Sequence, residues 1–249
     1  MQADVALVTG AARRIGRQIA LRLAKEGYGL VLHYGSSRQS AEELAREIAD
    51  AGGQAIFLRA DLSDPEAATA MIAAAAGELG PVNLLVNSAA IFQDDAIEAL
   101  DLALWRRQFA VNVEAPVFLA AAFARNLLGD REGAIVNIID QRVLRLTPQH
   151  LSYTLSKSTL WTATQTLAQA LAPRIRVNAV APGPTYPNPH DGESGLAREA
   201  AGVLLQRRVE GAEIAEAVAY LAKARNVTGQ LIAVDSGQHL GWRTPDIID

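Results

Sequence analysis

The alternation of two kinds of apolar segment constrains the fold of this chain more than any other feature. Short apolar runs predict strands at residues 5–9, 29–34, 54–59, 82–87, 133–139, 175–180 and 231–234. Segments of helical length lie between them, near 14–26, 39–51, 64–79, 101–129 (expected to hold two helices), 152–172 and 212–223. Such alternation is typical of an α/β protein with one doubly wound parallel sheet of about seven strands and helices on both faces.

Length and charge limit the organisation and the partners. A chain of 249 residues can bury a full core, so we expect a single domain over residues 1–249. The formal net charge of −4 argues against a nucleic-acid surface, and no apolar run approaches the roughly 18–20 residues of a membrane span. The first residues lead into the first strand without a charged and then apolar leader, which predicts a cytoplasmic protein.

The first strand runs directly into a glycine-rich turn and a helix. The turn reads Thr9-Gly10-Ala11-Ala12-Arg13-Arg14-Ile15-Gly16. At such a turn, free N–H groups and the positive end of the helix dipole face an anion, and glycine lets the backbone approach it. At the first strand of an alternating chain, this arrangement predicts a dinucleotide site with Gly10, Ile15 and Gly16 in contact with the cofactor.

A tyrosine and a lysine stand four residues apart, as Tyr153 and Lys157. On a helix these positions share one face, so the ammonium can lie beside the phenol. A nearby positive charge lowers the pKa of a tyrosine from about 10 toward the range of a working acid or base. The pair therefore predicts proton transfer by Tyr153, with its pKa lowered by Lys157.

The end of the second strand indicates which dinucleotide is preferred. A site for NADH usually places an acidic residue there, which binds the ribose 2′-hydroxyl. Here no aspartate or glutamate follows the strand before Glu42. The nearby hydroxyl, imidazole and guanidinium groups suit a 2′-phosphate instead, and they belong to Arg13, Arg14, His33, Tyr34 and Ser36. NADPH, or NADP in its oxidised form, is therefore the predicted cofactor.

Over its whole length the chain resembles a short-chain dehydrogenase/reductase. The residues that carry the resemblance are Thr9-Gly10 and Gly16, Asp61-Leu62, Asn87-Ser88-Ala89, Asn112, Tyr153 and Lys157, Asn178, and Pro182-Gly183. The resemblance implies a single Rossmann domain that binds a nicotinamide dinucleotide and a small-molecule substrate. It also implies a homotetramer, for which the alanine-rich helices near 115–128 and 156–170 have smooth faces.

The same resemblance implies contacts with the cofactor at Asp61, Leu62, Asn87, Ala89, Lys157, Pro182, Gly183 and Thr185. Asp61 would meet the adenine, and Asn87 the ribose region of adenosine. The segment from Pro182 to Thr185 would line the nicotinamide. Lys157 would hold the hydroxyls of the nicotinamide ribose.

For catalysis, the resemblance implies Tyr153 as the proton donor and Asn112 as the support of a water linked to Lys157. One residue departs from the common pattern. Most members carry a serine thirteen residues before the tyrosine, where its hydroxyl orients a substrate carbonyl, but this chain has Asp140. An ionised carboxylate only accepts hydrogen bonds, so it suits a substrate with N–H groups or a proton relay toward Tyr153. Arg14 is a second departure, because many members have a small residue there.

Both departures resemble the pteridine reductase branch, which includes bacterial dihydromonapterin and dihydrofolate reductases. An aromatic residue follows the fourth strand in that branch, and Phe92 holds this position, where it would stack a pterin ring against the nicotinamide. Ala90 departs, since these reductases usually have a serine there. The resemblance implies NADPH-dependent reduction of a C=N bond in a dihydropterin or dihydrofolate, with Tyr153, Asp140 and Phe92 in the substrate site.

Two segments are candidates for shaping the substrate pocket. The interval near 183–206 follows the sixth strand, where open α/β sheets bind ligands, and its composition predicts a substrate loop. The C-terminal tail, 237–249, holds Trp242, and in tetrameric members such a tail reaches the active site of a neighbouring subunit. A frayed tail with one aromatic residue is the alternative.

Two other functions remain open. A carbonyl reductase acting on a ketone, sugar or 3-oxoacyl thioester predicts that Asp140→Ser preserves or raises activity. A non-catalytic NADP(H)-binding regulator or scaffold predicts cofactor binding without turnover that depends on Tyr153. No metal site is expected, because the four histidines are isolated and no pair has a ligand spacing.

Overall fold

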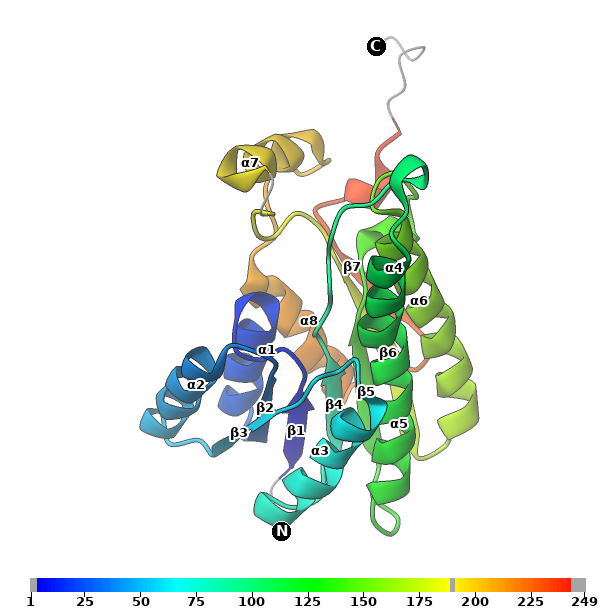
Figure 1. Cartoon of the computed structure of the whole chain (residues 1–249). Coiled ribbons are helices and arrows are strands. Elements are labelled where there is room, and N and C mark those ends of the chain that lie inside the picture. Colours follow the sequence, from blue (N-terminus) through cyan, green and yellow to red (C-terminus); the bar gives the residue numbers. More distant parts are fainter. Residues whose placement is uncertain (1–3, 189–190, 243–249) are drawn as a thin grey trace.

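Seven parallel strands form one sheet in the order β3-β2-β1-β4-β5-β6-β7 (Figure 1). The computed structural model describes residues 4–188 and 191–242. The strands are β1 (Val5–Val8), β2 (Gly29–Tyr34), β3 (Ala55–Arg59), β4 (Leu84–Asn87), β5 (Gly133–Ile138), β6 (Ile175–Pro182) and β7 (Leu231–Val234). Every residue of β1, β2, β4 and β5 is buried, as expected for parallel strands that are covered on both faces.

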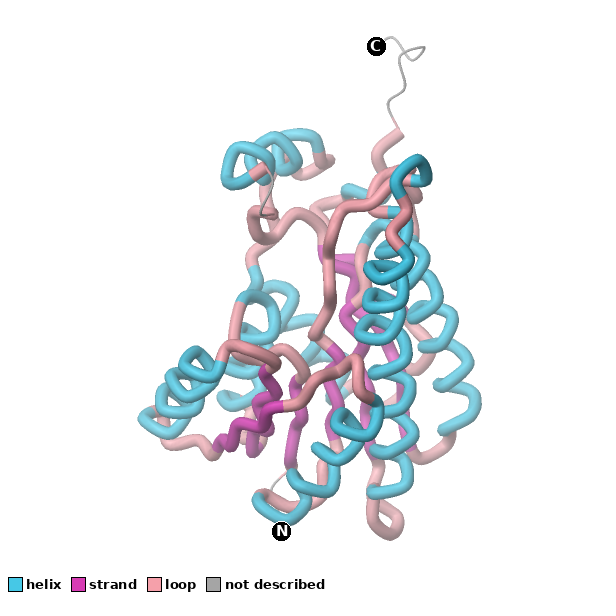
Figure 2. The backbone as a smooth tube through the Cα atoms, in the orientation of Figure 1, coloured by secondary structure: helices cyan, strands magenta, loops and turns pink. Residues whose placement is uncertain are grey.

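Helices cover both faces of the sheet. They are α1 (Arg14–Lys25), α2 (Arg38–Asp50), α3 (Pro65–Glu78), α4 (Leu102–Phe109), α5 (Ala115–Asn126), α6 (Leu151–Leu171), α7 (Gly192–Gly202) and α8 (Gly211–Lys223). On one face, α1, α2 and α8 share a hydrophobic cluster with the strands, which includes Ile19 and Val218. On the other face, α3, α5 and α6 share a second cluster, which includes Met71 and Phe123. Figure 2 shows the strands between the two groups of helices and confirms the predicted doubly wound sheet.

The strand order reverses between β1 and β4. From this point the chain builds the sheet outward to β3 on one side and to β7 on the other. In open α/β sheets, ligands bind at the carboxyl ends of the strands beside such a reversal. The glycine turn after β1 and the segment after β4 both start at this place, so the fold brings them together.

Two segments differ in detail from the sequence-based expectation. The interval near 183–206, expected as a loop, contains helix α7, which buries Leu196 on its inner side. The helix was not predicted because its few apolar residues stand between Pro- and Gly-rich segments, which are typical of loops. The segment 101–129 is divided into α4 and α5 as expected, but a π-helical turn, Ala110–Glu114, joins them without a loop.

Helices α1 to α8, as far as the structure describes them, include none that is long and apolar enough to cross a bilayer. The predicted C-terminal tail is described as far as Trp242, and its remainder, 243–249, lies outside the described residues. Figure 1 shows α7 and the start of this tail beyond the same end of the molecule.

Candidate active site

The turn after β1 keeps side chains away from its backbone. Gly10 has φ +64°, a left-handed conformation that favours glycine, and a Cβ there would lie 3.0 Å from Cα of Ala89. A Cβ on Gly16 would lie 2.2 Å from the carbonyl oxygen of Gly10. Arg13 is the N-cap residue of α1, and its side chain gives no capping hydrogen bond within the described part of the chain. A helix N-terminus of this kind suits a phosphate.

His33 supports this turn from behind. The N–H of Gly10 donates to Nδ1 of His33 at 3.0 Å, and Nε2 of the same ring lies 3.2 Å from the carbonyl oxygen of Ala60. Burial lowers the pKa of His33, so the ring is neutral, with Nε2 as the donor and Nδ1 as the acceptor. Tyr34 is buried in the core next to it, whereas Ser36 is exposed. A direct cofactor contact by His33 stays a prediction.

The two arginines of the turn point in different directions. Arg13 donates from its guanidinium to the hydroxyl of Ser37, just beyond the end of β2. Arg14 lies over the ring of Tyr186, with 5.2 Å between its guanidinium carbon and the ring centroid, and it donates to the carbonyl oxygen of Pro187 at 3.2 Å. Arg13 therefore lies beside the predicted 2′-phosphate position, and Arg14 connects the turn to the segment between β6 and α7.

The ends of β3 and β4 place the other predicted cofactor residues. The carboxylate of Asp61 accepts hydrogen bonds from the N–H and the hydroxyl of Ser63, which lower its pKa, and Leu62 is buried. Asn87 donates from its side chain to Oδ1 of Asn137 at 2.8 Å. Its own Oδ1 is buried and has no hydrogen-bond partner in the described part of the chain. A buried acceptor of this kind is expected to have a partner in the functional state.

Thr9 fixes the end of β1 to the end of β4. Its Oγ1 accepts hydrogen bonds from the backbone N–H groups of Ser88 and Ala89, at 2.9 and 3.0 Å. Ile15 is half-buried in the first turn of α1, where it packs against the hydrophobic cluster on that face of the sheet. These hydrogen bonds hold the glycine turn and the segment after β4 together.

Tyr153 and Asp140 share a hydrogen bond. The phenol donates to Oδ2 of Asp140 at 3.1 Å, and Oδ1 accepts the backbone N–H of Arg142 at 2.8 Å. Burial raises the pKa of Tyr153 well above its usual value, and the charge of Asp140 acts in the same direction. The predicted lowering of this pKa by Lys157 is therefore wrong for this structure. The burial and the carboxylate hold Tyr153 as a neutral phenol, which is the form that donates a proton.

Lys157 lies on the same face of α6 as Tyr153, one turn further on. Its Nζ lies 5.8 Å from the centroid of the Tyr153 ring and donates to the carbonyl oxygen of Ile138 at 2.8 Å. Burial lowers the pKa of Lys157 from 10.5 to about 8, and Asp140 opposes this shift. Lys157 is thus held near the ring of Tyr153, where burial of the phenol and the charge of Asp140 determine the direction of the tyrosine pKa shift.

Asn112 lies in the π-helical turn and is completely buried. Its side-chain oxygen accepts the N–H of Ile91 at 2.9 Å, and its amide donates to the carbonyl oxygen of Ile91 and to Oγ of Ser156, both at 3.0 Å. This residue therefore joins the segment after β4 to helix α6. π-helical turns often occur at functional sites because they displace one side chain from the regular helical register.

Phe92 follows this anchored segment and lies against Tyr153, the predicted proton donor. Its ring centroid is 4.7 Å from that of Tyr153, edge to face, and 4.5 Å from that of His150. The guanidinium carbon of Arg142 lies 5.8 Å from the same centroid. Phe92 is 37% exposed, so part of the ring remains open to a ligand.

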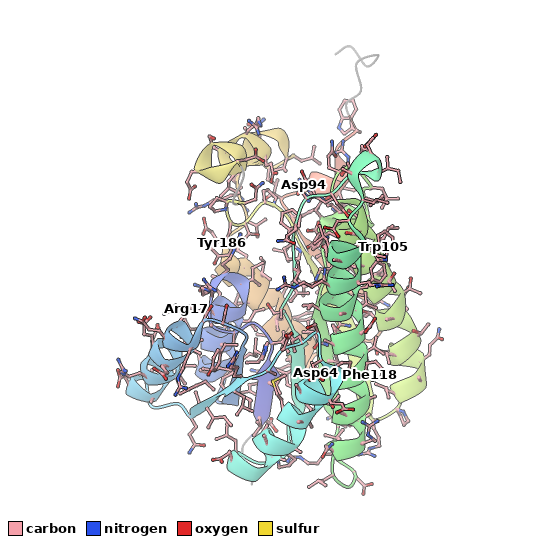
Figure 3. The ribbon with its side chains drawn as sticks, in the orientation of Figure 1. Arg17, Asp64, Asp94, Trp105, Phe118 and Tyr186 are labelled. Atoms are coloured by element: carbon pink, nitrogen blue, oxygen red, sulfur yellow. The ribbon has the colours of Figure 1, made fainter. Side chains whose placement is uncertain are left out.

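The sequence did not identify the residues that clamp the start of α6. Both carboxylate oxygens of Asp95 lie near the backbone N–H of Ser152, at 3.1 and 3.2 Å, and Asp94 pairs with His150 at 3.1 Å. Figure 3 shows Asp94 on the segment after β4, at the carboxyl edge of the sheet. Two adjacent acidic residues shortly after Phe92 are the signal that was available, because carboxylates stabilise helix N-termini.

At the segment predicted to line the nicotinamide, the end of β6 packs closely on the end of β7. A Cβ on Gly183 would lie 2.6 Å from Cα of Asp235, so only glycine fits there. Thr185 donates from its hydroxyl to the carbonyl oxygen of Gly183 at 2.9 Å, and Pro182 ends β6. Trp242 is half exposed. Its predicted reach into a neighbouring subunit stays a prediction.

Residues 4–188 and 191–242 contain no group of acidic, histidine or cysteine side chains that could hold a metal ion. The predicted catalytic residues Asp140, Tyr153, Lys157 and Asn112 do come together at the carboxyl edge of the sheet. The turn residues and Phe92 border the same place. The arrangement can therefore bind a dinucleotide and deliver a proton beside an aromatic surface.

Comparisons with known proteins agree with this arrangement. The family model described as enoyl-(acyl carrier protein) reductase matches residues 10–239. The FolM alternative dihydrofolate reductase 1 of Brucella suis, solved in complex with NADP, superposes with a TM-score of 0.96 at 48% identity and covers 100% of both chains. An uncharacterised oxidoreductase of Methylorubrum extorquens is 38% identical over 245 residues, which are 95% of this chain and 98% of that protein.

The 3-oxoacyl-(acyl-carrier-protein) reductase FabG of Staphylococcus aureus is 33% identical over 240 residues, which are 94% of this chain and 98% of that protein. The matches thus extend over the glycine turn, the Tyr153 and Lys157 pair and the strands that carry them. The chain belongs to the short-chain dehydrogenase/reductase family.

Proposed function

We propose that this protein is an NADPH-dependent reductase that acts on a C=N bond of a dihydropterin, dihydrofolate included. The observation that carries the proposal is the hydrogen bond from Tyr153 to Asp140 beside the partly exposed ring of Phe92. A carboxylate accepts hydrogen bonds from the N–H groups of a pterin, but when ionised it gives none to a substrate carbonyl. The similarity to the NADP-bound FolM of Brucella suis supports the same reaction.

The residues present fit NADP(H) as the cofactor. The uncapped N-terminus of α1 and the open turn at Gly10 and Gly16 would bind the pyrophosphate. Arg13, held beside Ser37, would bind the 2′-phosphate. A ribose hydroxyl would satisfy the buried Oδ1 of Asn87.

The side chains around the proposed substrate position would have different roles. The cofactor supplies the hydride when it is bound. Tyr153 would donate the proton of its hydroxyl to the ring nitrogen, and its raised pKa keeps that proton in place beforehand. Asp140 would accept ring N–H groups or help to reprotonate Tyr153. Phe92 would position the flat ring, and Lys157 would hold the ribose beside Ile138.

A carbonyl reductase is the second candidate, because FabG of Staphylococcus aureus is 33% identical to this chain over nearly its whole length. Most carbonyl reductases of the family have a serine hydroxyl at the position of Asp140, where an ionised carboxylate gives no hydrogen bond to a substrate carbonyl. If this candidate is correct, Asp140→Ser preserves or raises activity on ketones and 3-oxoacyl thioesters. A regulator or scaffold that binds NADP(H) without turnover is the third candidate.

The test is NADPH oxidation by the purified protein with dihydropterins and dihydrofolate, in parallel with ketones, sugars and 3-oxoacyl thioesters. We expect turnover of the pterins, and we expect Tyr153→Phe to lower kcat by about 100-fold or more. Tyr220→Phe is the matched control, because Tyr220 is exposed on α8, and this variant should keep the wild-type rate. Turnover of carbonyl compounds alone would replace the leading proposal with the second. NADPH binding without any turnover would favour the third.

A further inference from the structure

Arg142 has donor groups that the described residues do not use. It lies in a short 3-10 helix, Gln141–Val143, which follows Asp140. Its guanidinium forms an ion pair with Asp140, in which 3.7 Å separates Nη1 from Oδ1, a distance longer than a hydrogen bond. Its Nε is buried and has no hydrogen-bond partner among the described residues. Buried donors without a partner are rare, so this one calls for an explanation.

The position of Arg142 points to the substrate. Its guanidinium carbon is 5.8 Å from the centroid of Phe92, and the ring of Tyr153 is 4.7 Å from the same centroid. The proposed proton donor and an incompletely used guanidinium thus border one aromatic surface. His150 also contacts this surface, and its Nδ1 lies 3.1 Å from Oδ1 of Asp94 without a hydrogen bond. Burial lowers the pKa of His150, which favours the neutral ring, so Arg142 is the permanent cation beside Phe92.

We propose that Arg142 is a substrate-binding residue that donates a hydrogen bond to the carbonyl oxygen of a flat lactam ring lying on Phe92. The inference rests on the proposed function and identifies the ring carbonyl as a substrate group that the site recognises. Asp140 is an acceptor and Arg142 a donor, so together they match a ring that presents N–H and C=O groups. In a dihydropterin whose imine nitrogen lies beside the ring carbonyl, a donor near Tyr153 is in the right region to bind that oxygen.

The alternative is that Arg142 acts only on Asp140, as a nearby positive charge. The two roles predict different ligand dependence. A residue that binds the ring carbonyl matters only for ligands that have this carbonyl. A residue that acts only through Asp140 matters equally for every pteridine that binds to the carboxylate.

The experiment measures equilibrium binding of two pteridines to the NADP-loaded protein by ring fluorescence. One is pterin, which has the ring carbonyl, and the other is the diamino analogue, in which an amino group replaces the carbonyl oxygen. We expect Arg142→Met to weaken pterin binding by about 10- to 100-fold and diaminopteridine binding by less than about 3-fold. Arg142→Lys, which keeps a donor, should restore part of the loss for pterin only. Arg125→Met, on the exposed end of α5, is the control and should change neither.

The outcomes separate this inference from the proposed function. Equal losses for both ligands, or no loss for either, would overturn the role of Arg142 and leave pterin reduction standing. A wild-type protein that neither binds nor reduces any pterin, but reduces carbonyl compounds, would overturn both. The thermal midpoint of Arg142→Met, measured alongside, identifies a variant that fails to fold. In that event the binding comparison is made with Arg142→Lys and Arg142→Gln, and the same ligand dependence decides.

Discussion

Burial moves the pKa values of Tyr153 and Lys157 in opposite directions, because it disfavours the charged form of each side chain. The charged form of tyrosine is the phenolate, so Tyr153 keeps its proton. The charged form of lysine is the ammonium, so Lys157 releases its proton more easily. The same buried environment therefore keeps Tyr153 protonated as a proton donor. It also means that Lys157 is a cation only at a pH below its lowered pKa.

This difference predicts that NADPH binds more weakly as the pH rises through about 8, the pKa of Lys157. Below that pH the ammonium would give the proposed charge-assisted hydrogen bonds to ribose hydroxyls, and above it only a neutral amine would remain. We expect Kd for NADPH to rise roughly 10-fold across the transition, measured by dinucleotide fluorescence. Lys157→Met should bind weakly at every pH, and Lys223→Met, a change of an exposed lysine on α8, should keep the wild-type profile. A wild-type Kd independent of pH would contradict the assignment.

Some of these residue contacts could be predicted from the sequence and others could not. The meeting of Asp140 and Tyr153 was accessible, because their offset of thirteen residues matches a family pattern that this fold imposes. The hydrogen bond from Lys157 to the carbonyl oxygen of Ile138 was not accessible, because backbone carbonyls are the same in every sequence. The predicted lowering of the Tyr153 pKa was wrong for a different reason, because burial and the charge of Asp140 both raise this pKa.

At the scale of elements, the strands were predictable because parallel strands buried on both faces give nearly continuous apolar runs. Helix α7 was missed because it buries few residues, Leu196 among them, between Pro- and Gly-rich flanks. The π-helical turn at Asn112 adds a single residue to a helical turn, and no composition marks such an insertion. The π-helical turn belongs to the candidate site, because it holds Asn112 against Ser156 of α6.

The turn between β1 and α1 requires glycine at position 16, because the helix backbone there packs closely on the turn. A Cβ at Gly16 would lie 2.2 Å from the carbonyl oxygen of Gly10, so the turn or the helix must move. We expect Gly16→Ala to lower the free energy of unfolding by about 1–3 kcal/mol and to weaken NADPH binding. Urea denaturation and dinucleotide fluorescence measure the two effects.

Gly77 provides the matched control for this substitution. It lies in α3, and a Cβ there would have no neighbour within 4 Å. Alanine favours helices, so Gly77→Ala should be neutral or stabilise the protein by up to about 1 kcal/mol, with unchanged NADPH binding. Equal changes in the free energy of unfolding for the two substitutions would show that the close packing at Gly16 does not contribute to stability.

At the scale of the whole molecule, the outer side of α4 and α5 carries large apolar side chains. Leu102 and Phe118 are 62% and 49% exposed, and Trp105 stacks on Phe109 with 5.0 Å between ring centroids. Figure 3 shows Trp105 and Phe118 along this side of the molecule. Exposed apolar side chains gathered on one surface mark an interaction site more often than a solvent face. A second copy of the chain is the partner we expect, in the homotetramer implied by the family resemblance.

Sedimentation velocity tests this expectation directly. The wild-type protein should sediment with a mass near four times the 26.5 kDa of the chain. Phe118→Glu places a charge on the α5 surface and should shift the protein to smaller species, because a buried unpaired carboxylate opposes association. Ala51→Glu adds the same charge to an exposed position after α2, in the other helical layer, and should leave the assembly intact. A monomeric wild type, or a Phe118→Glu variant that sediments as the wild type does, would show that this surface faces solvent.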